Sequence, residues 1–404
     1  MPGNDVAAVP ENRWQVRQVT IGDHGYPYYY GADCMDLVLE ELAALRADRF
    51  VVVTDDTVLA LHGHALLSGL RPLAPVELVS HRPGESMKTL PTLAADIERV
   101  LAAGATRRSV VVALGGGVPG NLAGVIAALL FRGVRLVHIP TTTTAAMDSV
   151  LSLKQAINSN LGKNHIGTYL APHAVFTDVR LLATLPEREL RSGLCEAAKN
   201  CLAIRPDELP GLRRVLAGGR LADPESLLWL LDASVQAKTS VTASDTREQR
   251  TGLVLEYGHT VGHAVELCDH RRRGAEGLSH GEAIAFGMVV AARISHARGW
   301  LSAEHVALHE EIVGALGAPV RLPAGLSVDD VLETVRDDNK RGYLPPDPES
   351  VPFVLLHDLG KPAGEAELPL VQVALKEIQA ALESLEPPEP LEGPVPVSVE
   401  AEAR

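Results

Sequence analysis

The first half of the chain alternates short β-branched runs with amphipathic stretches, and this order constrains the fold more than any other feature. The runs predict strands at 48–56, 109–117 and 134–142, with helices at 92–105 and around 122–131. Strands that alternate with helices usually pair side by side in a parallel sheet with helices on its faces. The pattern therefore predicts an α/β domain, which we place at residues 1–178.

From about residue 180 the pattern becomes helical. Apolar residues recur at helical spacing in 186–202, 224–244 and 281–299. We therefore expect a second, all-helical domain at 179–385. A chain of 404 residues is also longer than one hydrophobic core usually supports. The Pro- and Glu-rich segment 386–404 predicts a disordered tail.

Composition and charge exclude several classes of partner. A net charge of −14 argues against nucleic acid and against an anionic membrane surface, because both require a basic footprint. The longest apolar run, 122–131, is too short to span a bilayer. The N-terminus does not read as an export signal, and the four cysteines show no paired spacing. These features predict a cytoplasmic protein with reduced thiols.

A glycine loop follows the predicted strand at 109–117. Gly115, Gly117 and Gly120 satisfy GxGxxG between a strand and a helix, a context that favours phosphate binding by backbone N–H groups. The ordinary dinucleotide fingerprint also expects an acidic residue about 20 positions further on. None occurs between Gly120 and Asp148, so a tight packing turn is the alternative. Two earlier acidic residues are placed to hold a ribose instead: Asp55, and Glu85 with Lys88 beside it.

The segment LEYGHTVGH at 255–263 carries two histidines four residues apart. On a helix His259 and His263 share one face, but a catalytic metal site usually needs three protein ligands. His280 and Glu196 are the further candidates, and such a set suits Zn²⁺ or Co²⁺. Spacing alone leaves open which of the two histidines is a ligand. A structural role is the alternative for each residue.

Basic and amide side chains gather around these motifs in an otherwise acidic chain. For any single lysine a solvated surface position is the default interpretation. Together they predict a phosphate site built from several segments. The residues are Arg132, Lys154, Lys163, Asn164, Lys199, Lys238 and Lys340, with Asp148 among them.

Ordered motifs between about residues 50 and 345 resemble the dehydroquinate synthase superfamily, the sugar-phosphate cyclases. They include PGExxK at 83–88, GGGVxG at 115–120, DSxxxxK at 148–154, GHTxGHAxE at 258–266 and HGEAxAxGM at 280–288. The resemblance implies a Rossmann-like parallel-sheet domain that binds NAD, followed by an all-helical domain that binds metal and substrate. It also implies a homodimer acting on a small sugar phosphate.

Matching motif by motif, the resemblance implies roles for individual residues. The ligands of one divalent ion, Co²⁺ or Zn²⁺, would be Glu196, His259 and His280. Phosphate contacts would be Lys154, Asn164 and His263, with Arg132 supplied by a neighbouring subunit and Lys163 and Lys340 nearby. Asp148, Lys199 and Lys238 would surround the substrate hydroxyls. NAD contacts would be Asp55, Glu85, Lys88, Gly115, Gly116, Gly117, Asn121, Thr141, Thr142 and Thr184.

Two departures from dehydroquinate synthases bear on the substrate. Gly252 stands where their arginine holds a carboxylate, and Glu256 stands where they have asparagine. A glutamate without a counter-ion would repel a carboxylated substrate, so one without a carboxylate is favoured. The stretches 148–164 and 255–263 are similar to the branch that uses glucose 6-phosphate in aminoglycoside antibiotic biosynthesis.

For that branch the resemblance implies a carbon–oxygen lyase. NAD would oxidise the sugar transiently, phosphate would be eliminated, the ketone would be reduced again, and an intramolecular aldol reaction would close a deoxyinosose ring. The alternatives are a cyclase of the dehydroquinate or valiolone type, or an NAD- and metal-dependent polyol dehydrogenase. The dehydrogenase would need no lysine-rich phosphate pocket. A non-enzymatic scaffold is disfavoured because all the predicted metal ligands are present together with Lys154.

Overall fold

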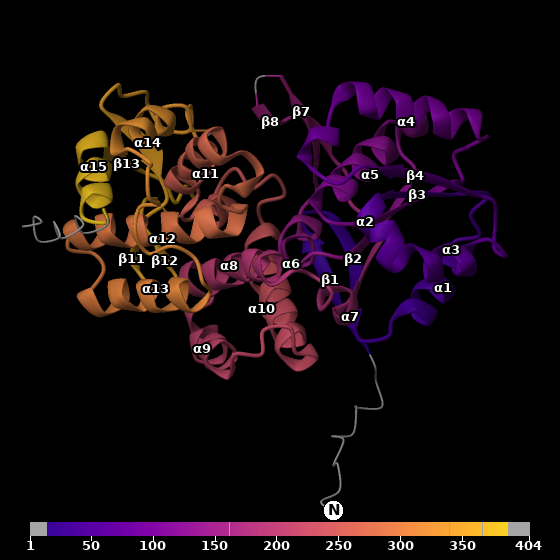
Figure 1. Ribbon diagram of the computed structural model, residues 1–404, viewed down its shortest axis with the longest axis horizontal. Helices are drawn as coiled ribbons and strands as arrows, with labels where there is room; N and C mark the ends of the chain where they lie inside the picture. Colours follow the sequence, from indigo (N-terminus) through magenta and orange to yellow (C-terminus); the bar gives the residue numbers. More distant parts are fainter. Residues whose placement is uncertain (1–13, 161, 339, 366, 387–404) are drawn as a thin grey trace, which may run out of the picture.

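The computed structural model describes residues 14–160, 162–338, 340–365 and 367–386. The predicted tail at 386–404 lies outside these residues except for Glu386. The strands of the first half and the helices of the second half form two lobes side by side (Figure 1). Among the described helices none is long and apolar enough to cross a membrane.

The first lobe is built on a seven-stranded sheet with the order β1-β2-β9-β6-β5-β3-β4. Every neighbouring pair is parallel except β1 and β2, which form an antiparallel hairpin at one edge. This confirms the predicted parallel α/β sheet and adds one antiparallel edge strand. The strands are β1 (Trp14–Ile21), β2 (His24–Gly31), β3 (Phe50–Asp55), β4 (Val76–His81), β5 (Val110–Gly115), β6 (Arg135–Pro140) and β9 (Ala174–Asp178).

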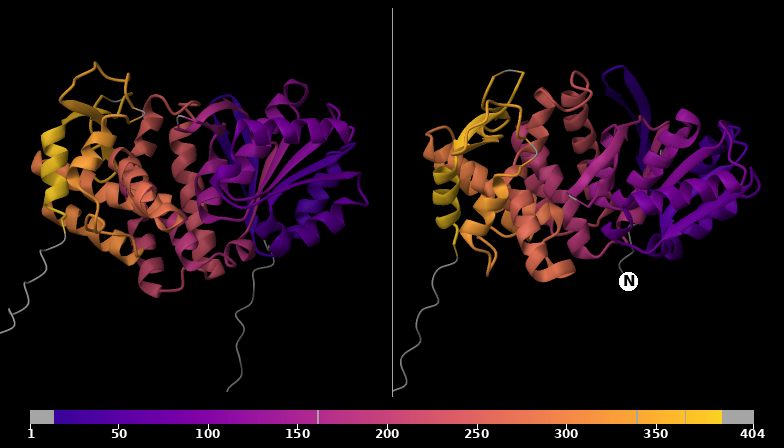
Figure 2. Two further views of the ribbon diagram at one scale, coloured as in Figure 1. Left: turned by 45° about the horizontal axis from the view of Figure 1, so that its top comes forward. Right: turned by 90° about the horizontal axis from the view of Figure 1, so that it is seen from above.

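Helices cover both faces of this sheet, which Figure 2 shows from two further directions. Val51 and Val53 of β3 face one hydrophobic cluster, and Phe50 and Val52 face the other. Both faces are therefore buried, which explains why β3 is a continuous apolar run and not an alternating one. The helices of this lobe are α1 (Met35–Ala44), α2 (Asp56–Val58), α3 (His64–Leu70), α4 (Leu90–Ala102), α5 (Gly117–Leu129), α6 (Thr143–Met147) and α7 (Val179–Leu182).

A hairpin of β7 (Lys154–Ser159) and β8 (Gly162–Tyr169) pairs outside the main sheet. It projects at the side of the first lobe that faces the second (Figure 1). The hairpin carries Lys154, Lys163 and Asn164, so three predicted phosphate-site residues belong to one supersecondary element.

The second lobe is predominantly helical, as predicted. Its described helices are α8 (Glu187–Ala203), α9 (Leu209–Gly218), α10 (Pro224–Thr242), α11 (His259–Arg273), α12 (His280–Ala297), α13 (Ala303–Ala315), α14 (Val328–Val335) and α15 (Leu375–Glu383). The expectation that it is all-helical needs one correction, because two small antiparallel sheets lie near its end. Strands this short show no period of two, so the pattern could not reveal them. They are β10 (Ser350–Phe353), β11 (Leu356–Asp358), β12 (Lys361–Pro362) and β13 (Val371–Ala374).

Polar contacts join the lobes. Asp232 of α10 accepts hydrogen bonds from Arg17 of β1 at 2.8 Å and from the buried Tyr30 of β2 at 2.5 Å. The Thr143 hydroxyl of α6 donates to the Leu190 carbonyl of α8 at 2.9 Å. The first lobe is therefore fixed against the two helices that lead into the site.

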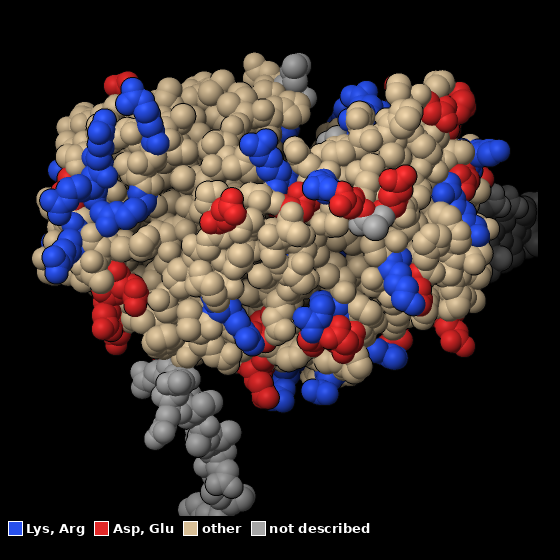
Figure 3. Space-filling model, turned by 180° about the vertical axis from the view of Figure 1, so that it is seen from behind, with Lys and Arg blue, Asp and Glu red and all other residues tan. Residues whose placement is uncertain are grey.

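The surface turned away from the view of Figure 1 carries charges of both signs. Acidic and basic side chains are interspersed across its middle, and basic ones gather at the end of the sheet-bearing lobe (Figure 3). A polyanion would require a continuous basic stripe. On that face no such stripe crosses both lobes.

Candidate functional site

A cleft of about 740 Å³ lies between the lobes. The hairpin β7–β8 and the segment after α6 form its first-lobe wall. The helices α8, α10, α11 and α12 and the loop before α11 form the other. Of the predicted residues it is lined by Asn121, Asp148, Lys154, Asn164, Lys199, Lys238, Glu256, His259, His263 and His280.

Close helix contacts set the positions of the candidate metal ligands. A β-carbon added at Gly287 of α12 would lie 1.9 Å from the Gly258 carbonyl oxygen, directly before His259. One added at Gly281 would lie 1.9 Å from the Ser192 carbonyl oxygen of α8. Because only glycine allows such approach, α8, α11 and α12 meet backbone to backbone beneath the cleft.

Gly287→Ala is accordingly expected to destabilise the protein by about 3 kcal/mol, at the upper end of ordinary overpacking costs. The added methyl group cannot be accommodated without moving α12 away from Gly258. A lowered urea midpoint checks this. Gly314→Ala on α13 is the matched control, because its β-carbon would meet only Val320 at 3.9 Å. Equal stability of the two variants would contradict the prediction.

Three imidazoles converge at the floor of the cleft. Ligand atoms of His259, His263 and His280 all lie within 4.8 Å of one another. Glu196 lies just below, its Oε1 atom 3.9 Å from Nε2 of His259 and 3.7 Å from Nε2 of His280. The structure therefore brings the sequence-predicted set Glu196, His259 and His280 together, with His263 adjacent.

The hydrogen bonds separate His259 and His280 from His263. Nδ1 of His259 lies 3.2 Å from the Tyr257 carbonyl oxygen, and Nδ1 of His280 lies 3.0 Å from Glu266 Oε2. Each Nδ1 thus donates, which leaves the Nε2 lone pair toward Glu196, the usual arrangement of a metal-binding histidine. Within the described residues no such partner is found for the His263 ring.

Glu196 provides the test of whether a cation fits. Its Oε2 accepts from Lys199 Nζ at 2.5 Å, while its Oε1 is buried with no hydrogen-bond partner in the described part of the chain. A buried carboxylate oxygen without a partner is costly. Its position between two imidazole lone pairs suits a divalent ion bound by nitrogen and oxygen.

Burial controls the protonation of the imidazoles. It lowers the pKa of His259 and of His263 to about 3, so both rings are neutral near pH 7. Burial also favours the neutral form of His280, but the hydrogen bond and the charge of Glu266 outweigh burial and raise the pKa of His280. Glu266 also accepts from Lys163 Nζ at 2.8 Å, so one carboxylate joins the hairpin to the His280 ring.

The predicted substrate residues are arranged as ion pairs. Lys238 Nζ donates to Asp148 Oδ1 at 2.7 Å, and although burial opposes it, Lys238 keeps the pKa of Asp148 low. Lys340 Nζ lies 3.5 Å from Glu256 Oε2. The expectation that Glu256 lacks a counter-ion is therefore wrong. Against the effect of burial, His259 and Lys340 hold the pKa of Glu256 well below its usual value.

Arg132 lies apart from the cleft of its own chain. It is exposed after α5, and both Phe131 and Arg132 have left-handed backbones with φ of 54° and 69°. It is not among the residues that line the cleft. Lys163 is likewise exposed, held by Glu266.

The glycine loop lies between β5 and α5, as predicted. A β-carbon at Gly115 would lie 2.7 Å from Pro119 and one at Gly116 2.9 Å from Thr142, whereas Gly117 has open space around it. The loop is thus tightly packed at Gly115 and Gly116 and open at Gly117, where the 13-residue helix α5 begins. Such a cradle of backbone N–H groups fits a diphosphate.

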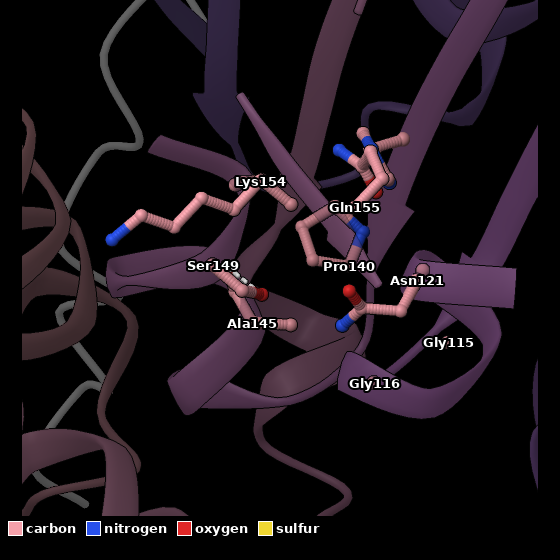
Figure 4. A pocket seen from close by; sticks show the side chains of 11 residues that line it. Gly115, Gly116, Asn121, Pro140, Ala145, Ser149, Lys154 and Gln155 are labelled. Atoms are coloured by element: carbon pink, nitrogen blue, oxygen red, sulfur yellow. Dashed lines mark hydrogen bonds between the residues drawn. The ribbon is translucent and has the colours of Figure 1, made fainter. Parts of the chain in front are cut away.

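Figure 4 shows a cavity of about 10 Å³ beside this loop, roughly the room for one water. Asn121 points into it, whereas Lys154 extends away. The Asn121 amide donates to the Gly117 carbonyl at 2.8 Å and accepts from the Ala156 N–H at 2.8 Å. Asn121 therefore joins the loop to β7, and its predicted contact with NAD stays a prediction.

His138 also lines this cavity, and its buried Nε2 has no partner among the described residues. Burial lowers its pKa from 6.5 to about 4. Below pH 6.5 the unfolded chain therefore binds a proton that the folded chain does not, and stability falls as pH falls from 6.5 toward 4. At pH 5 this costs about 2 kcal/mol.

Replacing His138 by Gln is expected to remove that dependence. Between pH 7 and pH 5 the variant should lose about 2 kcal/mol less unfolding free energy than the wild type. Urea titrations at both pH values measure the difference. His309, whose pKa burial also lowers to about 4, remains in both proteins as an internal reference. The same pH dependence in both proteins would contradict the assignment.

The remaining predicted NAD residues lie along the same edge of the sheet. Asp55 caps α2 by accepting from the Val58 N–H at 2.9 Å. Glu85 is exposed and lies 3.7 Å from Lys88, whose ammonium also donates to Asn164 of β8. Three threonines complete the set: Thr141 is buried after β6, Thr142 caps α6, and Thr184 lies 3.0 Å from His62.

Glu248 is a cleft residue that was not predicted from the sequence. This residue lines the cleft, and its carboxylate accepts from Lys154 Nζ at 2.6 Å. Glu266 stands within the quoted GHTxGHAxE motif, but its contacts with His280 and Lys163 were not expected. No local pattern around Glu248 indicates its role, because its position depends on backbone geometry.

A helical lobe beside a parallel-sheet lobe, a glycine cradle and a His–Glu floor define a class of protein, and the chain belongs to the 3-dehydroquinate synthase family. The N-terminal model of that family matches residues 78–192 and the C-terminal model matches residues 193–341. The chain is 47% identical over 379 residues to 2-deoxy-scyllo-inosose synthase of Streptomyces kanamyceticus, covering 93% of this chain and 96% of that protein.

Solved structures give the same relation. A 2-deoxy-scyllo-inosose synthase complexed with carbaglucose-6-phosphate, NAD⁺ and Co²⁺ matches with a TM-score of 0.84 and 35% identity, over 92% of this chain and all of that one (100%). The 2-epi-5-epi-valiolone synthase from Streptomyces hygroscopicus subsp. jinggangensis 5008, with NAD⁺ and Zn²⁺ bound, matches with a TM-score of 0.75 and 26% identity, over 91% of this chain and 99% of that one.

Proposed function

We propose that this chain acts as a 2-deoxy-scyllo-inosose synthase, a carbon–oxygen lyase that converts glucose 6-phosphate into 2-deoxy-scyllo-inosose and phosphate for aminoglycoside antibiotic biosynthesis. The observation that carries the proposal is one cleft in which Lys154 lies beside two carboxylates, Glu248 and Glu256, above the His–Glu floor. The synthase of Streptomyces kanamyceticus at 47% identity supports the same activity.

NAD⁺ and one Co²⁺ or Zn²⁺ ion are the cofactors of this proposal. Glu196, His259 and His280 would hold the metal, and the glycine loop with Asp55, Glu85 and Lys88 would hold NAD⁺. When bound, NAD⁺ would accept and return a hydride while the metal polarised the oxygen at the same carbon.

The residues of the chain itself bind and orient the substrate. Lys154, Asn164 and His263 orient the phosphate, which must leave in a defined direction. Asp148 and Lys238 form a preorganised pair for sugar hydroxyls, and Lys199 holds Glu196 in place from beneath. Glu256, kept ionised by its neighbours, accepts from a hydroxyl of the sugar.

The active form we propose is a cytoplasmic homodimer. Arg132 is exposed and lies off the cleft of its own chain, which suits a side chain that completes the partner's phosphate site. The four cysteines are buried and free, which suits a reducing compartment. Mixing Arg132→Ala with Lys154→Ala chains tests the dimer: activity should return in mixed dimers, and its absence in a protein that sediments as a dimer would contradict the shared site.

Phosphate release from purified protein tests the activity. With NAD⁺ and Co²⁺ present, glucose 6-phosphate should release phosphate and yield the carbocyclic ketone, whereas sedoheptulose 7-phosphate should not react. Accumulation of one NADH per turnover would point to a polyol dehydrogenase and contradict the proposal. Turnover of sedoheptulose 7-phosphate instead would assign a valiolone-type cyclase.

A further inference from the structure

The hairpin β7–β8 contains an irregularity at Asn158. Ile157 of β7 pairs with Ile166 of β8. The next pair joins Ser159 to Gly162, so β7 has one residue between the two pairs where β8 has three. Such a bulge withdraws backbone groups from the ladder and turns a side chain in a new direction, often beside an active site. Asn158 therefore lies outside the regular pairing of the two strands.

Asn158 makes hydrogen bonds through its backbone and through both ends of its amide. Its N–H donates to the Lys88 carbonyl oxygen at 2.8 Å. Its Oδ1 accepts from the Asn164 N–H at 2.9 Å, and its Nδ2 donates to Glu85 Oε1 at 2.8 Å. One residue of the hairpin thus holds both ends of the segment 85–88 on the neighbouring edge of the sheet.

These partners fix the direction of the Asn158 amide. A backbone N–H only donates, so the group that faces Asn164 must be the amide oxygen. The amide NH₂ therefore faces Glu85, whose ionised carboxylate only accepts. Asn164 has φ of 59°, a left-handed conformation that asparagine adopts more readily than most residues. The hairpin thus points a donor at Glu85 and at no other described side chain.

Glu85 is a side chain that depends on such a contact for its orientation. It is 43% exposed and begins the short turn Glu85–Met87, directly after Gly84, which has φ of 117°. Its ion pair with Lys88 is long at 3.7 Å, so the bond from Asn158 is the closer contact. Within the described residues both contacts involve Oε1, which leaves Oε2 to accept from a ligand.

The strand order supports a dinucleotide at this edge of the sheet. From β3 the chain passes first to β4 on one side and then to β5, β6 and β9 on the other. Dinucleotides bind outside the carboxyl ends of parallel strands where the order reverses, which here is between β3 and β5. The glycine loop follows β5 and the turn Glu85–Met87 follows β4, so both lie beyond carboxyl ends of the sheet.

We propose that Asn158 is a positioning residue of the dinucleotide site, which orients Glu85 to accept the neighbouring hydroxyl groups of a ribose. The proposal rests on the proposed function, in which Glu85 contacts NAD⁺. Asn158 acts through Glu85 and does not itself touch the ligand. Holding the carboxylate in place before binding removes the cost of ordering an exposed glutamate side chain when the dinucleotide arrives.

Titration of NAD⁺ into the full chain, without sugar phosphate, tests the proposal in the absence of turnover. Asn158→Ala should raise the dissociation constant by about tenfold or more, the range for losing a hydrogen bond to a charged group. The variant keeps the backbone N–H that bonds to Lys88, so it removes the amide contacts alone. Asn160→Ala, exposed at the turn of the same hairpin, is the matched control and should bind NAD⁺ as the wild type does.

A double-variant cycle separates positioning from a general structural role. Glu85→Ala should weaken NAD⁺ binding by itself. If Asn158 acts through Glu85, adding Asn158→Ala to Glu85→Ala should change the dissociation constant by less than about twofold. A structural role would instead weaken binding equally whether or not Glu85 is present.

A second pair of variants gives the same test with a smaller change of shape. In Asn158→Asp the new carboxylate still accepts from the Asn164 N–H but repels Glu85, so NAD⁺ binding should weaken by about tenfold or more. In a Glu85→Gln background the same substitution should cost less than about twofold, because the glutamine amide can donate to the new carboxylate.

An Asn158→Ala protein that binds NAD⁺ as tightly as the wild type overturns the inference, as does an equal loss of affinity with and without Glu85. Failure of the wild type to release phosphate from glucose 6-phosphate overturns the proposed function instead. The two failures are therefore seen in different measurements.

Discussion

Replacing His280 by Ala is expected to lower the affinity for Co²⁺ or Zn²⁺ more than a hundredfold and to abolish phosphate release. Loss of an outer-shell partner of a metal ligand typically costs about 10- to 100-fold in affinity, and loss of a ligand should exceed this. In this protein Nε2 of His280 points to the unpaired oxygen of Glu196 at 3.7 Å. Metal content after dialysis and calorimetric titration provide a readout that is separate from activity.

The control for this variant is His305→Ala. His305 lies on α13 and pairs with Asp358 at 3.2 Å, away from the cleft. It removes one imidazole from the protein without touching the floor of the site. Full metal content in the His280 variant would exclude this residue as a ligand. Loss of the metal from His263→Ala would then assign His263 to the metal site instead.

Lys154→Ala should lower kcat/KM for glucose 6-phosphate about a thousandfold, or ~4 kcal/mol, within the range for leaving a buried carboxylate, here Glu248, without its partner. Two effects add. The phosphate loses a cation, and Glu248, now unpaired, repels it. Burial alone would lower the pKa of Lys154, but Glu248 and Glu256 raise it, so the wild-type residue is fully charged at neutral pH.

A double variant separates these effects. If the unpaired Glu248 contributes, Lys154→Ala combined with Glu248→Gln should be more active than Lys154→Ala alone. Additive losses of kcat/KM in the double variant would show that the two residues act independently. They would exclude repulsion between the unpaired Glu248 and the phosphate.

The architecture could be predicted from the sequence wherever burial produces a clear hydrophobic pattern. β3 and β5 are buried on both faces, so their residues are uniformly apolar and easily recognised. The long helices α8, α10 and α12 begin and end within two residues of the expected segments. Strands such as β12, with two residues, carry no such signal.

The candidate site was less accessible to sequence reasoning. Spacing places His259 and His263 on one face but does not tell them apart, and the distinction depends on which Nδ1 atom finds an acceptor. The counter-ion of Glu256 is Lys340, 84 positions away. Glu248 depends on a left-handed backbone and on space at Gly252. Each of these is a tertiary property, so no local motif encodes it.

The hairpin β7–β8 has a thermodynamic consequence. Two adjacent residues on β8 reach opposite sides of the site: Asn164 accepts from Lys88 on the dinucleotide side, and Lys163 donates to Glu266, which holds His280. A displacement of the strand changes both contacts at once. If cofactor binding moves the hairpin, the factor by which the dinucleotide changes metal affinity must equal the factor by which metal changes dinucleotide affinity. Affinity measured for either ligand alone then describes a different equilibrium from the one that operates when both are bound.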